Sequence, residues 1–376
     1  MDELFEKVKS ISSNFNIPEE ITGYGVIDNG HINKTFYVTC SDSGVSRRFL
    51  LQNINTSVFK NPIQLMSNVI KVTDFLKNKI ALNGGDVQRE TLTVFPTKSG
   101  DSCYFDENGS CWRIYNFVEN SFTYNAIESP ELFFSVGEAF GNFLGLLSDF
   151  PMDELYETIP DFHDTRKRVI NFENSVKNDT AGRVSQVPDE ISYVLNSRDK
   201  TGIIVDMLSS GELPMRVTHN DTKLNNVMFD SDTKKAVCVV DLDTVMPGSA
   251  LYDFGDAIRY GANTGAEDEK DLSKVSLDEE LYRQYVRGYM SKAAKSLTEK
   301  EIELLPLSAW MMTFECGMRF LNDYIDGDVY FGISYPEHNL DRCRSQFELA
   351  KDIDRKIGVL SDITAKAYEE FNKGAF

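Results

Sequence analysis

The first third of the chain is rich in short runs of β-branched and aromatic residues separated by turn signals. Five such runs predict strands: 21–28, 34–40, 47–52, 90–95 and 111–118. The dipeptide Asn29-Gly30 predicts a turn between the first two strands. Apolar residues at helical spacing predict one helix over 2–14 and a second helix after Pro62. This part of the chain is therefore expected to form a sheet-rich lobe.

From Pro130 onward the apolar positions follow a helical period. Three segments predict helices: 132–150, 277–292 and 299–325. The segment 217–243 differs, because it consists of short strands and polar loops. The pattern predicts an α+β fold with two lobes, a β-rich amino-terminal lobe over 1–117 and a mainly helical carboxyl-terminal lobe over 118–376.

Composition narrows the class of protein. A chain of 376 residues is too long for one compact core and suits two lobes. The net charge of −20 disfavours nucleic acid and anionic membranes as partners. No apolar run approaches the length of a membrane-spanning helix, and the acidic start is unlike a signal peptide. We expect a cytoplasmic protein, as a monomer or alternatively a dimer.

The cysteines and histidines do not suggest a zinc or disulfide protein. The six cysteines are scattered and form no C-x-x-C pair. The four histidines show no spacing typical of zinc ligands. Buried or free thiols in a reducing compartment are expected.

One motif contains residues suited to catalysis. It reads His219-x-Asp221-x4-Asn226, and an apolar strand further on leads into Asp241-x-Asp243. Phosphoryl transfer from Mg-ATP uses one carboxylate at the acceptor hydroxyl, with an amide oxygen and a second carboxylate on the metal. The motif and its context indicate a small-molecule kinase with the bilobal protein-kinase-like fold.

Each residue of the motif has an expected role. Asp221 is the expected catalytic base for the acceptor hydroxyl. Asn226 offers Mg²⁺ a neutral oxygen, and Asp241 is the expected principal Mg²⁺ ligand. Asp243 is expected to contact a second metal ion or the sugar, or alternatively to brace the loop. His219 is expected to anchor the loop by hydrogen bonding.

Two further carboxylates follow in the segment 252–259. Asp253 and Asp256 are expected to support the catalytic loop from behind without contacting substrate. The alternative is that they simply cap a helix, since an Asp at a helix start accepts backbone N–H bonds.

The motif residues resemble the aminoglycoside phosphotransferase and choline kinase superfamily. Longer strings are similar to those of N-acetylhexosamine 1-kinases: 30–33, 51–55, 216–227, 241–248, 318–324, 327–331 and 336–342. The resemblance implies transfer of phosphate from ATP to a free N-acetylhexosamine, N-acetylglucosamine or N-acetylgalactosamine, giving the α-1-phosphate and ADP. It implies Mg²⁺ as the cofactor.

By the same resemblance, the amino-sugar pocket maps onto six residues of this chain: Asp221, Asp241, Arg319, Tyr330, His31 and Asn33. Arg319 would present a fork of donors, and Tyr330 a flat apolar face with a polar tip. The alternative reading makes Arg319 a salt-bridge residue at a helix end and Tyr330 a buried aromatic.

The nucleotide site departs from the protein-kinase pattern. The third strand carries Gln52 where protein kinases place a Lys, and the following helix has no partner Glu. The phosphates must then be held by Arg47 or Arg48, by Lys223, by backbone groups near Gly30, or mainly by Mg²⁺. The nucleotide-binding residues that we expect are these: Gly30, Gln52, Lys223, and Asn116, Phe117 and Val118 in the connector beside the adenine.

Two alternatives stay open at this point. Another kinase of the superfamily, acting on an aminoglycoside, choline, homoserine or a methylthio-sugar, fits the same motif. The acidic composition favours a cationic acceptor of that kind. A non-catalytic nucleotide or sugar sensor is motivated by the missing Lys and Glu pair.

Overall fold

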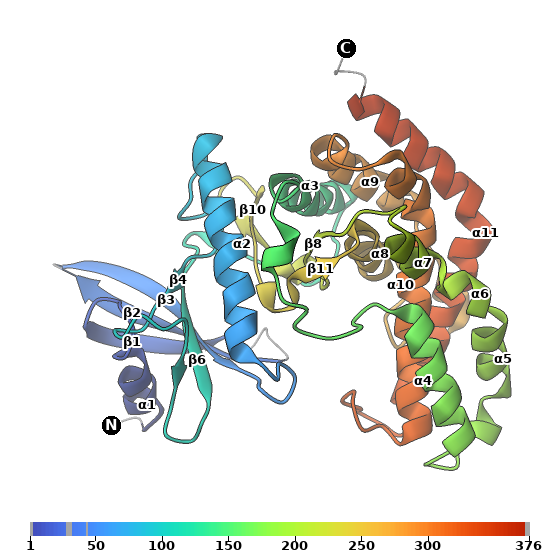
Figure 1. Ribbon diagram of the computed structural model, residues 1–376, viewed down its shortest axis with the longest axis horizontal. Helices are drawn as coiled ribbons and strands as arrows, with labels where there is room; N and C mark the ends of the chain where they lie inside the picture. Colours follow the sequence, from blue (N-terminus) through green and yellow to red (C-terminus); the bar gives the residue numbers. More distant parts are fainter. Residues whose placement is uncertain (1–2, 28–31, 43, 373–376) are drawn as a thin grey trace. The chain divides into compact units, whose positions relative to one another are not determined.

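The computed structural model describes residues 3–27, 32–42 and 44–372 (Figure 1). The chain forms two compact units that interleave along the sequence. The first unit consists of Met1–Thr123, Asp149–Pro160 and Val227–Pro247. The second consists of Tyr124–Ser148, Asp161–Asn226 and Gly248–Phe376. The division that we predict between residues 117 and 118 stays a prediction.

The first unit is built on an antiparallel sheet. Its strands are β1 (Glu20–Ile27), β2 (Lys34–Asp42), β3 (Val45–Ile54), β4 (Val94–Phe95), β5 (Tyr104–Phe105) and β6 (Cys111–Asn116). The strand order is β1-β2-β3-β6-β4, and β5 also pairs with β6. The register aligns Thr35, Gln52 and Arg113 in one row across β2, β3 and β6. Three polar side chains therefore share one face of the sheet.

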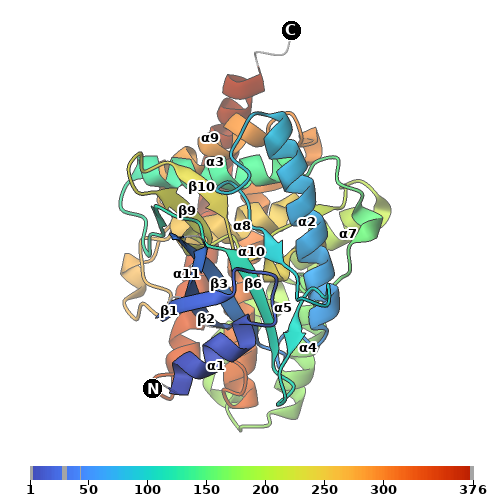
Figure 2. The ribbon, with the colours of Figure 1, turned by 90° about the vertical axis from the view of Figure 1, so that its left-hand side faces the viewer.

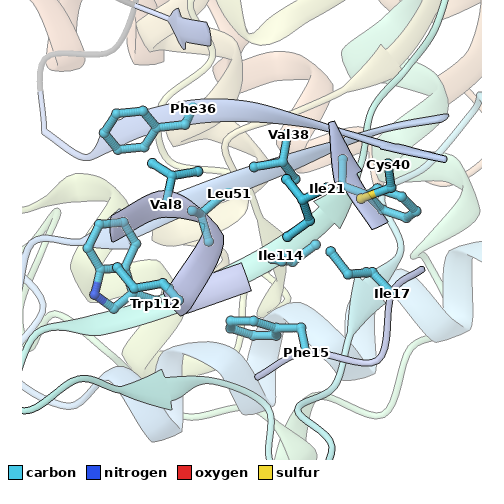
Figure 3. Close-up of a cluster of buried hydrophobic side chains, with 12 residues drawn as sticks. Val8, Phe15, Ile17, Ile21, Phe36, Val38, Cys40, Leu51, Trp112 and Ile114 are labelled. Atoms are coloured by element: carbon cyan, nitrogen blue, oxygen red, sulfur yellow. The ribbon is translucent and has the colours of Figure 1, made fainter. Parts of the chain in front are cut away.

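The opposite face of that sheet carries the apolar core of the first unit. Helix α1 (Glu3–Ser12) contributes Val8, which packs with residues of β2, β3 and β6 (Figure 3). Val38, Leu51 and Ile114 are fully buried there and alternate with residues of the polar face, as the strand period of two requires. Truncating such a residue to Ala costs about 2–5 kcal/mol.

Helix α2 (Pro62–Leu82) joins distant segments into the first unit. Its start is capped by Asn61, whose side chain accepts from the Gln64 N–H, and Pro62 occupies the first turn. The buried Asn68 side chain donates to the Tyr156 carbonyl at 2.7 Å and to the Val245 carbonyl at 3.0 Å. These bonds explain why segments around residues 156 and 245 belong to this unit.

The first unit also holds a small sheet in the order β10-β9-β7. Its strands are β7 (Ser121–Phe122), β9 (Val227–Asp230) and β10 (Ala236–Val239). The hairpin of β9 and β10 runs into η4 (Leu242–Thr244), and then into β11 (Met246–Gly248). The Asp-x-Asp segment therefore follows directly from this hairpin.

The second unit is mainly helical (Figure 2). Its α-helices are α3 (Pro130–Leu146), α4 (Thr165–Asn178), α5 (Pro188–Asn196), α6 (Arg198–Thr201), α7 (Ile203–Ser210), α8 (Ala250–Gly261), α9 (Glu279–Ala293), α10 (Glu299–Asp326) and α11 (His338–Asn372). The short strand β8 (Arg216–Thr218) leads toward the 3₁₀ turn η3 (Leu224–Asn226). Single 3₁₀ turns η1 (Met152–Glu154), η2 (Val184–Gln186) and η5 (Leu272–Lys274) complete the chain.

Glycines allow α3 and α9 to pack closely. A Cβ atom at Gly288 would clash with the backbone carbonyl of Phe134, and one at Gly137 would clash with the carbonyl of Tyr285. Helix α10 packs against α8, α11 and α4. It begins with a capping box formed by Thr298 and Glu301.

The predicted α+β fold class is confirmed, with a sheet-rich amino-terminal region and a helical carboxyl-terminal region. The strand predicted over 90–95 is wrong except for Val94–Phe95. Instead, a turn forms at 86–90, because the Glu90 side chain accepts from the Asp86 N–H at 2.6 Å. The predicted turn at Asn29-Gly30 lies outside the described residues. Among the described helices, none is long and apolar enough to cross a membrane.

Candidate active site

The catalytic loop of the second unit starts from a buried ion pair. Arg216 in β8 donates from Nε and Nη2 to the Glu301 carboxylate at 2.6 and 2.8 Å. Glu301 is fully buried, and it also accepts from the Thr298 N–H as part of the capping box. The pair fixes the strand that delivers the loop to the amino-terminal end of α10.

His219 is buried inside this loop. Its ring packs against the rings of Phe140 and Phe143 of α3, with centroids 5.6 and 5.9 Å away in edge-to-face geometry. Its Nδ1 accepts from the Asp221 N–H at 3.3 Å. The neighbouring Asn220 has a φ of 63°, a left-handed conformation that Asn tolerates better than most residues. His219 thus holds the backbone beside Asp221.

Two carboxylates of α8 hold the same loop. Asp253 accepts from the backbone N–H of His219 at 2.8 Å and of Asn220 at 2.7 Å. Asp256 accepts from the Thr222 N–H at 3.2 Å. The N-cap of α8 is Ser249, so Asp253 does not cap its own helix.

Burial and neighbouring charge act differently on these two carboxylates. Burial raises the pKa of Asp253 to about 6, against the opposing effects of His219 and of its backbone N–H donors. Burial also disfavours the charge of Asp256, but Arg259 and Lys223 outweigh it and lower the pKa of that carboxyl. The Arg259 Nε donates to Asp256 at 2.9 Å.

Asp221 keeps a partly exposed carboxylate. Its side chain is 27% exposed, and its Oδ1 lies 2.8 Å from the Lys223 ammonium. Its Oδ2 accepts from the Asn226 amide at 3.1 Å, and its backbone carbonyl accepts from the same amide nitrogen at 2.8 Å. The Asn226 nitrogen is therefore occupied, which leaves its Oδ1 as the atom suited to a hard cation.

The Asp-x-Asp segment lies in the first unit. Asp241 is exposed and left-handed, with φ 60° and ψ 59°. Asp243 is buried, with Oδ1 2.5 Å from Arg113 Nη1. Its Oδ2 accepts from the Asn33 amide at 2.6 Å. Both oxygens of Asp243 are thus engaged by protein groups.

Sequence reasoning missed Arg113, which organises this part of the first unit. Its side chain is only 1% exposed, and Nε and Nη2 donate to Gln52 at 3.1 and 2.8 Å. Gln52 in turn donates to Thr35 at 3.1 Å. Burial opposes the charge of Arg113, but Asp243 outweighs it and raises the Arg113 pKa. The available signal was a charged residue in a strand, β6, whose neighbouring residues Trp112 and Ile114 are apolar.

The predicted adenine connector follows β6. The Asn116 side chain accepts from the Thr93 N–H at 2.6 Å and donates to the Gln88 carbonyl at 2.9 Å, so it supports the adjacent turn. Val118 is buried, and the Arg48 guanidinium lies 4.0 Å from the centre of the Phe117 ring. Arg48 also forms an ion pair with Glu119.

Arg319 lies among aromatic rings of the second unit. Its guanidinium carbon is 5.4 Å from the Phe331 ring centre and 6.0 Å from those of Phe162 and Tyr330. Within the described residues no ion pair joins Arg319 to a carboxylate. Tyr330 is 67% exposed. The readings of Arg319 as a salt-bridge residue and of Tyr330 as a buried aromatic are therefore wrong.

A carboxylate one turn before Arg319 is fully used elsewhere. Glu315 contacts His163 Nδ1 at 2.9 Å and Arg168 Nε at 3.3 Å. Burial opposes its charge, but Arg168 and His163 outweigh it and hold its pKa at about 2. Within the described residues, Glu315 is therefore paired with His163 and Arg168 and not with Arg319.

The other predicted site residues are placed as follows. Gly30 and His31 lie outside the described residues. Asn33 accepts from the Asn55 N–H at 3.0 Å in addition to its bond to Asp243. Lys223, expected at the phosphates, contacts Asp221. Over the part of the chain that the structure describes, no three His, Cys, Asp or Glu side chains gather as a metal site.

Comparison with known proteins gives a family and a fold. The model of the "Phosphotransferase enzyme family" (APH) matches residues 26–290. An aminoglycoside phosphotransferase from Alicyclobacillus acidocaldarius has a similar structure, with a TM-score of 0.61 at 11% identity, covering 95% of this chain and 96% of that one. Choline kinase from Cryptosporidium parvum gives 0.58 at 16% identity, covering 94% and 97%. The choline kinase LicA from Streptococcus pneumoniae gives 0.53 at 10% identity, covering 94% and 100%.

Proposed function

Because this chain belongs to the phosphotransferase enzyme family, we propose that it is an ATP-dependent kinase of a free N-acetylhexosamine. The product would be the α-1-phosphate, with transfer to the anomeric hydroxyl. The observation that carries the choice of acceptor is Arg319, whose guanidinium lies among three aromatic rings and has no carboxylate partner within the described residues. The resemblance of the longer sequence strings to N-acetylhexosamine 1-kinases supports the same choice.

Asp221 is the proposed base. Its carboxylate is partly exposed and is oriented by Lys223 at Oδ1 and by Asn226 at Oδ2. In the reaction, Asp221 would accept a hydrogen bond from the anomeric hydroxyl and take its proton as the oxygen attacks the γ-phosphorus. The bond between that phosphorus and the bridging oxygen breaks, and ADP leaves.

Two residues of the motif have the chemistry that Mg²⁺ prefers. Asn226 would supply its amide oxygen, because its nitrogen donates to Asp221, and Asp241 would supply its carboxylate. Mg²⁺ commonly binds one or two carboxylates, substrate phosphates and water, so a small protein donor set suffices. When bound, the ion would neutralise charge on the transferring phosphoryl group.

Asp243 is proposed to position the backbone near Asp241 and not to bind the metal ion itself. Its two oxygens are engaged by Arg113 and Asn33, and the ion pair fixes the backbone two residues after Asp241. Arg113 is itself too buried to reach a phosphate. Phosphate binding would then depend on Mg²⁺ and on backbone groups, and the connector 116–118 would meet the adenine through its backbone.

The positive charge of Arg319 bears on which charge the acceptor can carry. A guanidinium donates to carbonyl and hydroxyl oxygens and repels a cation. An N-acetylated sugar offers such oxygens without positive charge. The second candidate is a cationic acceptor such as choline or an aminoglycoside, which the net charge of −20 favours at long range. We weigh the contact at Arg319 more heavily because the long-range field is screened by salt.

We further propose a monomer in a reducing cytoplasm. All six cysteines of the chain are free thiols and five of them are buried, and free thiols are usual in a reducing compartment.

The test is Mg²⁺-dependent ADP release with N-acetylglucosamine, N-acetylgalactosamine, glucose, galactose, choline and kanamycin as acceptors. The proposal expects turnover with the N-acetylated sugars, and loss of turnover when the anomeric oxygen is blocked as a methyl glycoside. Turnover with choline or kanamycin alone would replace the acceptor. Nucleotide binding without turnover on any acceptor would favour a sensor.

A matched variant checks the base. Asp221→Asn removes the charge but keeps the shape, and it should lower kcat by roughly 10³-fold or more while ATP still binds. The control is Asp206→Asn, because Asp206 is exposed and, among the described residues, forms an ion pair with Arg166 alone. An active Asp221→Asn protein would remove the proposed role.

A further inference from the structure

The segment that carries Tyr330 has no regular secondary structure. Helix α10 ends at Asp326 and is capped by Gly327, whose φ of 98° favours glycine, and the chain then runs through 328–337 before α11 begins. Val329 is 79% exposed and Tyr330 is 67% exposed. Exposed loop residues of this kind usually sample many conformations, so their placement needs a specific cause.

Asp323, in the last turn of α10, supplies that cause. Its Oδ1 accepts from the backbone N–H of Val329 at 2.9 Å and of Tyr330 at 2.8 Å. Its Oδ2 accepts from the Phe331 N–H at 2.8 Å and from the Asn339 amide at 2.9 Å. Three consecutive backbone donors thus converge on one buried carboxylate, which is 4% exposed.

A second layer supports this arrangement. Asn339 of α11 also donates to Asp328 Oδ1 at 2.9 Å, so one amide joins two carboxylates. Arg183 donates to Asp328 Oδ2 at 2.5 Å and to the Tyr324 carbonyl at 2.8 Å. The residues 328–331 are therefore tied to α10, to α11 and to the segment before η2.

These backbone bonds determine where the Tyr330 ring lies relative to Arg319. The peptide groups on both sides of Tyr330 are held, and its ring stands edge-to-face with Phe331 at 4.8 Å. Its ring centre lies 6.0 Å from the Arg319 guanidinium. The exposed Tyr330 ring is thus held beside the Arg319 guanidinium through its backbone, and no hydrogen bond from its own side chain is required.

From this geometry we propose that Asp323 is a positioning residue for the acceptor site. It acts through the backbone of 329–331 and presents Tyr330 to the acceptor next to Arg319. The proposal rests on the proposed function, in which Tyr330 and Arg319 bind the acceptor. It predicts that Asp323 governs the affinity for the acceptor and leaves the affinity for ATP unchanged.

The primary variant is Asp323→Asn, which keeps size but replaces one acceptor oxygen with an NH₂ group that faces backbone donors. The matched control is Asp326→Asn, because Asp326 lies three residues further along α10 and accepts from Ser175 and Asn322. Within the described residues, no side-chain hydrogen bond joins Asp326 to 328–331. Arg183→Met is a second variant, which weakens the hold on Asp328 and leaves the Asp323 carboxylate intact.

Two readouts separate the inference from the function on which it rests. Amide hydrogen exchange of the full chain, followed by mass spectrometry of peptides covering 328–331, needs no substrate. Exchange at 329–331 should become roughly tenfold faster in Asp323→Asn, to a smaller extent in Arg183→Met, and not in Asp326→Asn. Steady-state kinetics should then show the acceptor KM raised by roughly tenfold in Asp323→Asn, with the ATP KM unchanged.

The contrary results are distinct. Unchanged exchange at 329–331 in Asp323→Asn would overturn the proposed clamp. Faster exchange with equal rises in both KM values would overturn the positioning role, because a general loss of structure affects both substrates. Absence of turnover with any N-acetylhexosamine in the unmodified protein would refute the proposed function alone, and hydrogen exchange would still decide on the clamp.

Discussion

Asp253→Asn tests how the catalytic loop is held. The Asp253 carboxylate accepts two adjacent backbone N–H bonds, at 2.8 and 2.7 Å, from His219 and Asn220. An amide has one acceptor oxygen, so one backbone donor would face an NH₂ group. A hydrogen bond to a charged group is worth about 1.5–3 kcal/mol. If about 2 kcal/mol of positioning is lost, kcat falls roughly 30-fold.

Stability should respond to the same variant in a pH-dependent way. The Asp253 pKa is about 6 in the folded protein against an ordinary value of 3.8, because of burial. The folded protein therefore binds this proton more tightly than the unfolded chain does. The resulting stabilisation is complete below the unfolded pKa and is lost as pH rises through about 6. From pH 4 to pH 7 this loss amounts to about 2 kcal/mol.

Asn does not titrate, so the variant lacks that loss. At pH 4 the folded protein carries Asp253 as the neutral acid, which Asn resembles, so the free energy of unfolding should change by about 1 kcal/mol or less. At pH 7 the unmodified protein has lost the stabilisation that the proton supplies and the variant has not, so the variant should be the more stable by about 1–2 kcal/mol. Thermal or urea unfolding of both proteins from pH 4 to pH 7, with ADP release at pH 7, measures both effects. A stability difference independent of pH, or full activity, would refute the reasoning.

Three further substitutions probe the framework. Arg113→Met leaves the Asp243 carboxylate buried without its cation. Urea unfolding should show the first unit destabilised by about 3–5 kcal/mol. A loss under about 1 kcal/mol would show that the pair is dispensable. Glu301→Gln should cost a similar amount in the second unit, whereas Glu370→Gln in an exposed pair should cost less than about 1 kcal/mol. Gly288→Ala should lower the melting temperature, because overpacking costs about 1–3 kcal/mol. Gly358→Ala has open space around it in α11 and should raise the melting temperature. Equal shifts of the melting temperature would contradict the close packing of α3 and α9.

The parts of the fold that follow local patterns were predictable. Alternating apolar residues placed β1, β2, β3 and β6, and helical periodicity placed most of α2, α9 and α10. The residues 90–93 read as a strand because Thr and Leu favour strands there. The Glu90 carboxylate instead closes a turn with the Asp86 N–H, and that competition is invisible to periodicity.

The candidate site likewise contains residues that a local motif predicts and residues that it does not. The spacing of Asp221 and Asn226 lies within one loop, so a local motif reveals it. Arg113 meets Asp243 across 130 positions of sequence, and only the fold brings them together. Asp323 binds N–H groups six to eight residues later, but backbone donors leave no mark in the sequence. Contacts of these kinds depend on tertiary structure, and side-chain patterns cannot predict them.

The position of the phosphate in the product tests the central claim most directly. The unmodified protein, Mg-ATP and N-acetylglucosamine would be incubated together, and the product would be examined by ³¹P and ¹H nuclear magnetic resonance. The account predicts a single sugar phosphate in which phosphorus couples to the anomeric proton of the α anomer, with no product from Asp221→Asn. Phosphate on any other hydroxyl, or product formed only from a cationic acceptor, would contradict it.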